Sequence, residues 1–144
     1  MSIENETLTL EFDGGSRGNP GPAAAGAAVR AADGTPLVTI GKFLGRATNN
    51  VAEYRGLILA MEKALELGAK RVEIRGDSEL IVRQMNGQYR VKSPDLRPLY
   101  EAAQSLLRKF ESASITHNLR HHNTLADRLA NLAMDRKADV EELP

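Results

Sequence analysis

The spacing of apolar residues changes partway along the chain, and this change limits the fold more than any other feature of the sequence. From Thr7 to Asp13 apolar and polar residues alternate, which is typical of a strand with one buried face, and the pair Gly14-Gly15 predicts its end. Residues 23–31 and 36–45 continue as strands, joined through Asp33-Gly34, a pair common in tight hairpins. After residue 50 apolar residues recur at every third or fourth position, the period of an amphipathic helix. The first half therefore predicts three antiparallel strands followed by a helix.

The second half alternates helices with short strands. Capping residues and glycines mark its elements: a helix from Thr48 to Gly68, a strand ending at Gly76-Asp77, a helix from Ser78 to about Met85, a helix starting near Pro94 and Pro98, a strand over 114–119 and a helix from Asn123. The order βββαβααβα predicts an α/β fold in which helices pack on the faces of a mixed sheet.

The length of 144 residues suits one domain, 1–144, with its core at about 7–135 and a short charged tail, 136–144, that we expect to fray. Nineteen basic and nineteen acidic residues cancel, so a polyanion has to be held by a local site. The absence of cysteine excludes disulfides and zinc–thiolate sites. The apolar runs are too short for a bilayer and the first residues lack a signal core, so we expect a cytoplasmic protein without membrane partners.

Four acids stand at the ends of predicted elements, where packing does not require them. They are Asp13, Glu53, Asp77 and Asp127. The N-terminus of a helix favours the ionised carboxylate, which is the form that binds a hard cation. Taken singly, each acid is better explained as an ordinary capping or first-turn residue, and spacing along the chain cannot make the four converge.

Two polar segments lie beside these acids. Residues 14–22 hold more glycine than a hairpin needs, and Thr48-Asn49-Asn50 offers more polar groups than one helix cap uses. Both segments could contact the backbone, sugars or bases of a polyanion, and both could instead be a plain turn and a plain cap. A third segment, 83–98, is basic and carries Arg90 and Lys92; its alternative is a solvated loop.

Four motifs in order resemble the type 1 ribonuclease H family over about residues 7–135. They are Asp13-Gly-Gly-Ser-Arg-Gly-Asn-Pro-Gly-Pro22, Thr48-Asn-Asn-Val-Ala-Glu-Tyr54, Gly76-Asp77-Ser78 and His117-Asn-Leu-Arg-His-His-Asn-Thr-Leu-Ala-Asp127. The resemblance implies the ribonuclease H fold, with a five-stranded mixed sheet of three antiparallel and then two parallel strands. It also implies an endonuclease that hydrolyses the RNA strand of RNA/DNA hybrids to 5′-phosphate and 3′-hydroxyl ends.

The resemblance assigns the four acids to two Mg²⁺ ions, with Mn²⁺ as a substitute. Asp13 bridges both ions, Asp127 completes the nucleophile side, and Glu53 with Asp77 holds the leaving-group side. His117 matches a mobile-loop histidine that serves proton transfer or product departure.

Substrate contacts follow from the same resemblance. It assigns contacts with the RNA 2′-hydroxyls to Gly14, Gly15, Ser16, Asn19, Asn49 and Asn50. It assigns a DNA phosphate to Arg46 and Thr48, and we count Asn123 among the substrate-binding residues as well.

The chain departs from many relatives because it has no tryptophan and no long basic protrusion after the predicted helix 78–85. We therefore expect affinity for the hybrid to rest on Arg90 and Lys92 and to fall steeply with salt. Compact members of the family that lack the protrusion sometimes also cut RNA–DNA junctions or double-stranded RNA. Both stay open as further substrates of this chain. The alternative function is a module that binds hybrid or double-stranded RNA without cutting, which should have lost a carboxylate. We expect a monomer.

Overall fold

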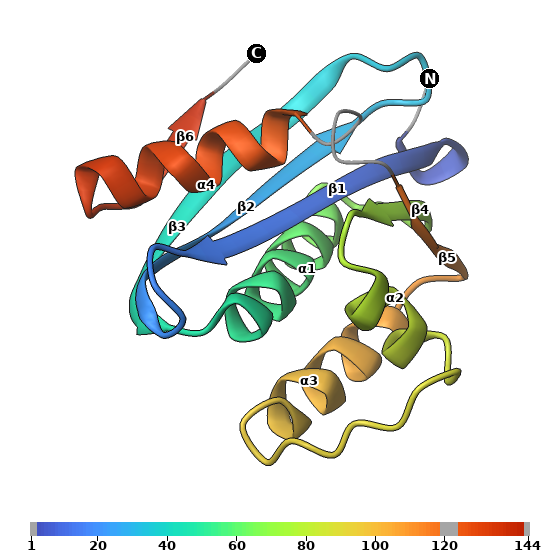
Figure 1. Cartoon of the computed structure of the whole chain (residues 1–144). Helices are drawn as coiled ribbons and strands as arrows, with labels where there is room; N and C mark the ends of the chain where they lie inside the picture. The colour runs from blue at the N-terminus through green and yellow to red at the C-terminus, as the bar shows by residue number, and fades with distance from the viewer. Residues whose placement is uncertain (1–2, 119–123, 143–144) are drawn as a thin grey trace.

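The computed structural model describes residues 3–118 and 124–142. Figure 1 shows one twisted sheet with α4 on one face and α1 on the other. The strands are β1 (Thr7–Ser16), β2 (Gly21–Arg30), β3 (Pro36–Ala47), β4 (Arg71–Gly76), β5 (Ser112–His117) and β6 (Val140–Glu142); the helices are η1 (Ile3–Asn5), α1 (Asn49–Glu66), α2 (Glu79–Met85), α3 (Arg97–Leu107) and α4 (Thr124–Arg136). In the described ranges no helix is both long and apolar enough to cross a bilayer.

The predicted meander is confirmed, with longer strands. β1, β2 and β3 pair antiparallel in sequence, and the β2–β3 turn closes where the Ala31 amide donates to the Thr35 carbonyl. The pair Gly14-Gly15 does not end β1, as the sequence suggested, because both glycines pair with β2, opposite Ala25 and Ala24. Asp13 therefore lies inside an antiparallel strand.

Parallel pairing on the other side of β1 ends earlier than the antiparallel pairing. The strand order is β5-β4-β1-β2-β3-β6, and the last parallel pair between β1 and β4 is Phe12 with Gly76. Asp13 and Asp77 are the next residues of these two strands, so both acids follow the same edge of the parallel ladder. The α/β architecture with a mixed sheet is as predicted.

The sheet has six strands rather than five, and the expectation of a frayed tail is wrong for residues 140–142. Val140 is buried beneath α4, and β6 pairs with β3. The hydroxyl of Thr39 donates to the Glu142 carbonyl at 3.0 Å, and the Phe43 amide donates to the Asp139 carboxylate at 2.9 Å. The segment is charged, but one buried valine and these bonds suffice to order it.

The two faces of the sheet differ in their cores. On the face under α1, α2 and α3, the main cluster joins Leu8, Leu10 and Phe12 of β1 to α1 residues such as Leu57 and Met61. The helices α1 and α2 begin as predicted, since Thr48 and Ser78 each accept a hydrogen bond from a first-turn amide. The cluster under α4 is small and consists of Ala24, Leu129, Ala133, Met134 and Val140.

Candidate metal centre

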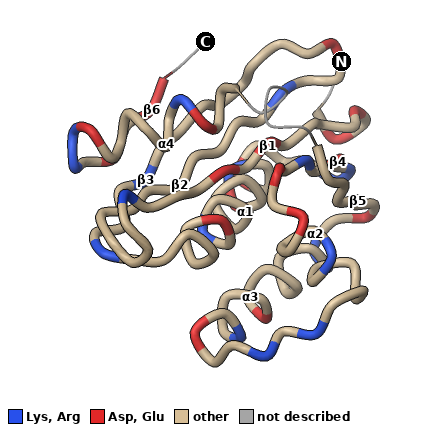
Figure 2. The backbone as a smooth tube through the Cα atoms, in the orientation of Figure 1, with Lys and Arg blue, Asp and Glu red and all other residues tan. Residues whose placement is uncertain are grey.

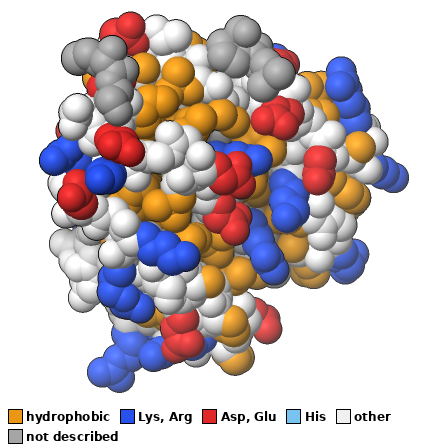
Figure 3. Space-filling model, turned by 180° about the vertical axis from the view of Figure 1, so that it is seen from behind, with side chains coloured by type: hydrophobic (Ala, Val, Ile, Leu, Met, Phe, Trp, Pro, Cys, Tyr) orange, Lys and Arg blue, Asp and Glu red, His pale blue; other side chains and the backbone are white. Residues whose placement is uncertain are grey.

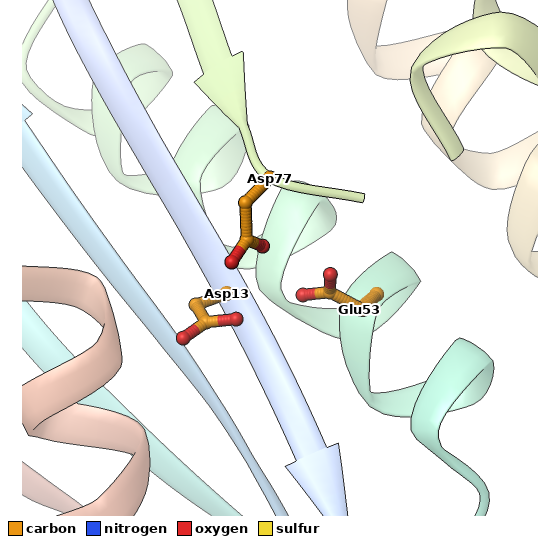
Figure 4. Close-up of side chains that lie close together, drawn as sticks. All are labelled: Asp13, Glu53 and Asp77. Atoms are coloured by element: carbon orange, nitrogen blue, oxygen red, sulfur yellow. The ribbon is translucent and has the colours of Figure 1, made fainter. Parts of the chain in front are cut away.

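Three of the four predicted acids meet at the end of the parallel ladder. Asp13 comes from β1, Glu53 from α1 and Asp77 from the β4–α2 junction, and one oxygen of each lies within 4.8 Å of the others. Figure 4 shows the three carboxylates turned toward one another across the gap between β1 and α1. Residues that are 64 positions apart in the sequence are thus neighbours, which spacing alone could not establish.

Glycines bring Glu53 to Asp13. A methyl group at Gly14 would overlap the backbone of Ala52, and one at Gly56 would overlap the backbone carbonyl of Asp13. Because neither position carries a side chain, the backbones of β1 and α1 touch directly. The sequence suggested that the glycines of residues 14–22 let a polyanion approach the main chain, whereas Gly14 allows the close approach of α1.

The fourth acid, Asp127, reaches the site from the opposite face. Gly26 pairs with Asp13 across β1 and β2, and a methyl group at Gly26 would overlap the Ala126 carbonyl in the first turn of α4. This contact brings half-buried Asp127 beside Asp13, close enough for their carboxyl groups to share a hydrogen bond when one of them is protonated. All four acids line one pocket of about 420 Å³.

Burial and mutual repulsion make these carboxylates hard to ionise. Burial, the hydrogen bond with Asp127 and the charge of Asp77 raise the pKa of Asp13 to about 7. Burial and then the charges of Asp13 and Asp77 raise the pKa of Glu53 well above its ordinary value. Among the described residues no hydrogen bond reaches the buried Oε1 atom of Glu53. Clustered oxygens with an unmet acceptor fit a hard divalent cation, which would remove the repulsion.

His117 lies next to this cluster but belongs to a strand rather than to a mobile loop. It pairs with Gly76 as the last residue of β5. Its exposed ring places Nε2 3.2 Å from the backbone oxygen of Asp77. A titratable ring is therefore held at the rim of the carboxylate group.

The asparagines near the pocket are partly used inside the protein. The Asn49 side-chain oxygen accepts from the Ser16 amide at 2.8 Å, and the Asn19 side-chain oxygen accepts from the Asn49 amide at 3.1 Å. These bonds fasten the β1–β2 turn to the start of α1. Since the oxygen of each side chain is engaged, its NH₂ group is the part that can donate to a ligand. Asn49, Asn50, Gly15 and Ser16 line the pocket.

The remaining predicted contacts lie apart from the acids. Arg46 is exposed near the end of β3, two residues before the cap Thr48. Arg90 and Lys92 line a separate hollow on the loop between α2 and α3, whose basic residues can be followed in Figure 2. Beside them Tyr89 is exposed, with the Arg83 guanidinium 5.3 Å from its ring centre. Asn123 lies outside the described residues.

Sequence reasoning missed the residues that hold the acids in place. Gly26 and Gly56 set the helix contacts, and Arg17 and Asn131 line the pocket. A glycine inside the alanine-rich strand 23–31 was the available signal for Gly26, since glycine weakens a strand unless another backbone approaches it. On the face shown in Figure 3, acidic and basic side chains are interspersed.

The fold and site define an α/β protein with a carboxylate-lined pocket where the parallel ladder of its mixed sheet ends, and carboxylate oxygens are the ligands that hard divalent cations prefer. Residues 11–133 match the family described as "Reverse transcriptase-like". The chain is 52% identical over 132 residues to "Bifunctional protein Rv2228c" of Mycobacterium tuberculosis, covering 91% of this chain and 36% of that protein. It thus spans about a third of the length of this curated relative.

Solved structures agree closely with the fold. The crystal structure of RNase H1 from Halobacterium salinarum has a TM-score of 0.88 and 46% identity, with 90% of this chain and 98% of that chain covered. LC11-RNase H1 in complex with an RNA/DNA hybrid has a TM-score of 0.86 and 39% identity, with 91% and 99% covered. The chain belongs to the ribonuclease HI family.

Proposed function

We propose that this chain is an endoribonuclease that hydrolyses the RNA strand of RNA/DNA hybrids and leaves 5′-phosphate and 3′-hydroxyl ends. The observation that carries the proposal is the shared pocket of Asp13, Glu53, Asp77 and Asp127 where the parallel pairing of β1 with β4 ends. The relatives support it, since one is named ribonuclease HI and another was solved with a hybrid bound.

The four acids divide the work according to their positions. These acids would hold two divalent cations, which would supply charge neutralisation of the phosphodiester and activation of a water molecule as the nucleophile. Asp13, between Asp127 on one side and Glu53 with Asp77 on the other, is suited to serve both ions. Asp127 then serves the nucleophile side, and Glu53 with Asp77 the leaving-group side. We propose Mg²⁺ as the natural ion and Mn²⁺ as a substitute.

His117 is the group best placed to move a proton at the leaving-group side. Its Nε2 atom lies 3.2 Å from the backbone oxygen of Asp77, one of the two acids on that side. An imidazole changes charge near neutral pH, so it can give a proton to the departing 3′-oxygen and recover it from solvent.

Selection of RNA rests on the polar rim of the pocket. The NH₂ groups of Asn19 and Asn49, oriented by the bonds of their own oxygens, can donate to 2′-hydroxyls or to acceptors in the minor groove. Asn50 and the backbone of Gly14, Gly15 and Ser16 complete this contact. Arg46 and Thr48 bind a phosphate of the DNA strand, and Arg90 with Lys92 adds a salt-sensitive grip. Asn123 is proposed as a further contact.

We also propose that the chain works in the cytoplasm as a monomer and as a single domain. Double-stranded RNA and RNA–DNA junctions are proposed as secondary substrates, since the short loop between α2 and α3 imposes few contacts on the second strand.

Cleavage of a hybrid tests the proposal. With Mg²⁺ or Mn²⁺ the protein should cut the RNA strand and spare the DNA strand and single-stranded RNA. Asp13→Asn should lower the rate by about 100-fold or more while the hybrid still binds in Ca²⁺. Asp33→Asn changes an exposed acid of the β2–β3 turn in the same way and should leave the rate unchanged. Equal cutting of both strands, or an active Asp13→Asn protein, contradicts the proposal.

A further inference from the structure

Arg17, at the tip of the β1–β2 turn, links two helices that carry different acids of the pocket. Its guanidinium lies 2.5 Å from the Asp135 carboxylate and 3.5 Å from the Asn131 carbonyl, both on α4. The same turn is fastened to α1 through Asn49. The turn therefore bridges the helix of Glu53 and the helix of Asp127.

The contacts of Arg17 fall on the face of α4 that carries Asp127. Residues 127, 131 and 135 follow one another at four-residue spacing, so they form one stripe along the helix. The Asn131 side chain continues the stripe by donating to the Asp127 carbonyl at 3.0 Å. Both Arg17 and Asn131 line the pocket of the four acids. The bridge thus ends on the residues that surround Asp127.

The backbone contacts of α4 with the sheet lie at Ala126 and Leu129, where Gly26 and Gly41 carry no side chain. The cluster of buried residues under α4 is small, and Arg128 pairs with Glu142 of β6. The Arg17 bridge adds a side-chain link between the pocket-facing stripe of α4 and the turn that is fastened to α1. It therefore bears on the separation between Asp127 and the other three acids.

We propose that Arg17 is a positioning residue: through Asp135 and Asn131 it holds α4 at the distance from which Asp127 can share a cation with Asp13. The proposal deepens the function proposed above and rests on the metal centre of that function. Arg17 and Asp135 are half-exposed, at 49% and 60% of their side-chain surface, so their ion pair contributes little to global stability. The ion pair instead affects the position of one proposed metal ligand, Asp127.

Removing either the positive or the negative partner of the ion pair distinguishes a positioning role of Arg17 from a direct effect of its charge on the bound cation. Arg17→Ala removes a positive charge near the pocket and Asp135→Ala removes a negative one. If only long-range charge matters, the first strengthens Mn²⁺ binding and the second weakens it. If the bridge positions Asp127, both weaken binding, about threefold to fivefold, and the double variant is no weaker than either single variant.

The measurement is a calorimetric titration of the substrate-free protein with Mn²⁺, together with hydrogen exchange of the α4 amides. Both variants should bind Mn²⁺ more weakly and exchange faster in α4, Arg17→Lys should recover part of the loss, and KM for the hybrid should change less than twofold. Arg71→Ala, which removes a similarly exposed ion pair at the far end of β4, should change neither signal.

Shifts of opposite sign, or unchanged Mn²⁺ binding in both variants, overturn the proposal. A large rise in KM with Arg17→Ala alone would instead make Arg17 a contact of the nucleic acid. Because the titration contains no substrate, it tests the bridge even if the wild-type chain cuts no hybrid.

Discussion

The two faces of the sheet hold their parts of the site in different ways. In the described part of the chain, the cluster under α1 contains 22 buried residues and the cluster under α4 contains five. Glu53 belongs to α1, which packs on the larger cluster, and Asp127 belongs to α4, which packs on the smaller one. Asp13 lies between them. The face under α1 (the thick face) thus buries the larger apolar cluster, and the face under α4 (the thin face) contributes one carboxylate on a helix with a small buried cluster. Stability and catalytic geometry should therefore respond to different substitutions.

The largest effect on stability should come from the thick face. Met61 is fully buried on α1, two turns beyond Glu53. Met61→Ala should lower the free energy of unfolding by about 2–5 kcal/mol, measured by urea denaturation, because it leaves a cavity in the main core. The rate of hybrid cleavage at a temperature where the variant is folded should stay within threefold of wild type. A rate that fell with the stability would remove the distinction between the faces.

Gly26→Ala should produce the reverse pattern on the thin face. The added methyl group overlaps the Ala126 carbonyl, so α4 has to shift and take Asp127 away from Asp13. We expect a stability loss of about 1–3 kcal/mol, but a larger loss of activity and of Mn²⁺ affinity than Met61→Ala causes. Gly15→Ala is the matched control for stability and Mn²⁺ affinity, since its methyl group would meet only Asn49 Oδ1, at 3.9 Å. Normal Mn²⁺ binding by Gly26→Ala would show that α4 is not held through this contact.

The carboxylates between the faces should make metal-free protein less stable as pH rises. The pKa of Asp13 is about 7 in the folded protein and near 4 when unfolded, so between these pH values the folded state binds more protons. The free energy of unfolding should fall through this window by up to about 1.4 kcal/mol per pH unit for one proton. The raised pKa of Glu53 extends the fall to higher pH.

Thermal or urea unfolding from pH 4 to pH 8, with a chelator present, measures this slope. Asp13→Asn should flatten it, and saturating Mg²⁺ should recover the stability lost at pH 8 because the cation binds the ionised form. A slope of the opposite sign would mean that the folded protein stabilises the charged carboxylates without a metal.

The smallest effect on stability should come from β6. Val140→Ala removes two methyl groups beneath α4 and should cost about 1–2 kcal/mol in urea denaturation. Its effect on Mn²⁺ affinity should nevertheless exceed that of Met61→Ala. Equal Mn²⁺ affinity of Val140→Ala and Met61→Ala would show that the packing of β6 beneath α4 does not affect the metal site.

The sequence predicted the element order and the four acids because both depend on local patterns. Apolar periodicity marked the strands and α1, and Thr48 and Ser78 marked the helix starts. β6 was missed because a three-residue strand with one apolar residue has no periodicity to detect. Gly14-Gly15 was read as a strand end because the sequence alone does not reveal the alanines that face it.

That the four acids meet in space could be predicted only from the resemblance to the ribonuclease H family. The sequence contained its physical cause, the glycines at 14, 26 and 56, but their partners are the backbones of helices far along the chain. The use of Asn19 and Asn49 inside the protein was likewise hidden, because a polar side chain looks the same whether it binds a ligand or a neighbouring amide.

The β2–β3 turn is a suitable place to attach a label or a surface linker to the protein. It lies beyond the pairing of Thr9 with Arg30, at the opposite end of β1 from Asp13, and Ala32 within it is exposed. The chain contains no cysteine, so Ala32→Cys would introduce a single thiol for a fluorophore or a surface linker. An immobilised molecule tethered there would present its pocket outward, as a sensor for nucleic acids requires.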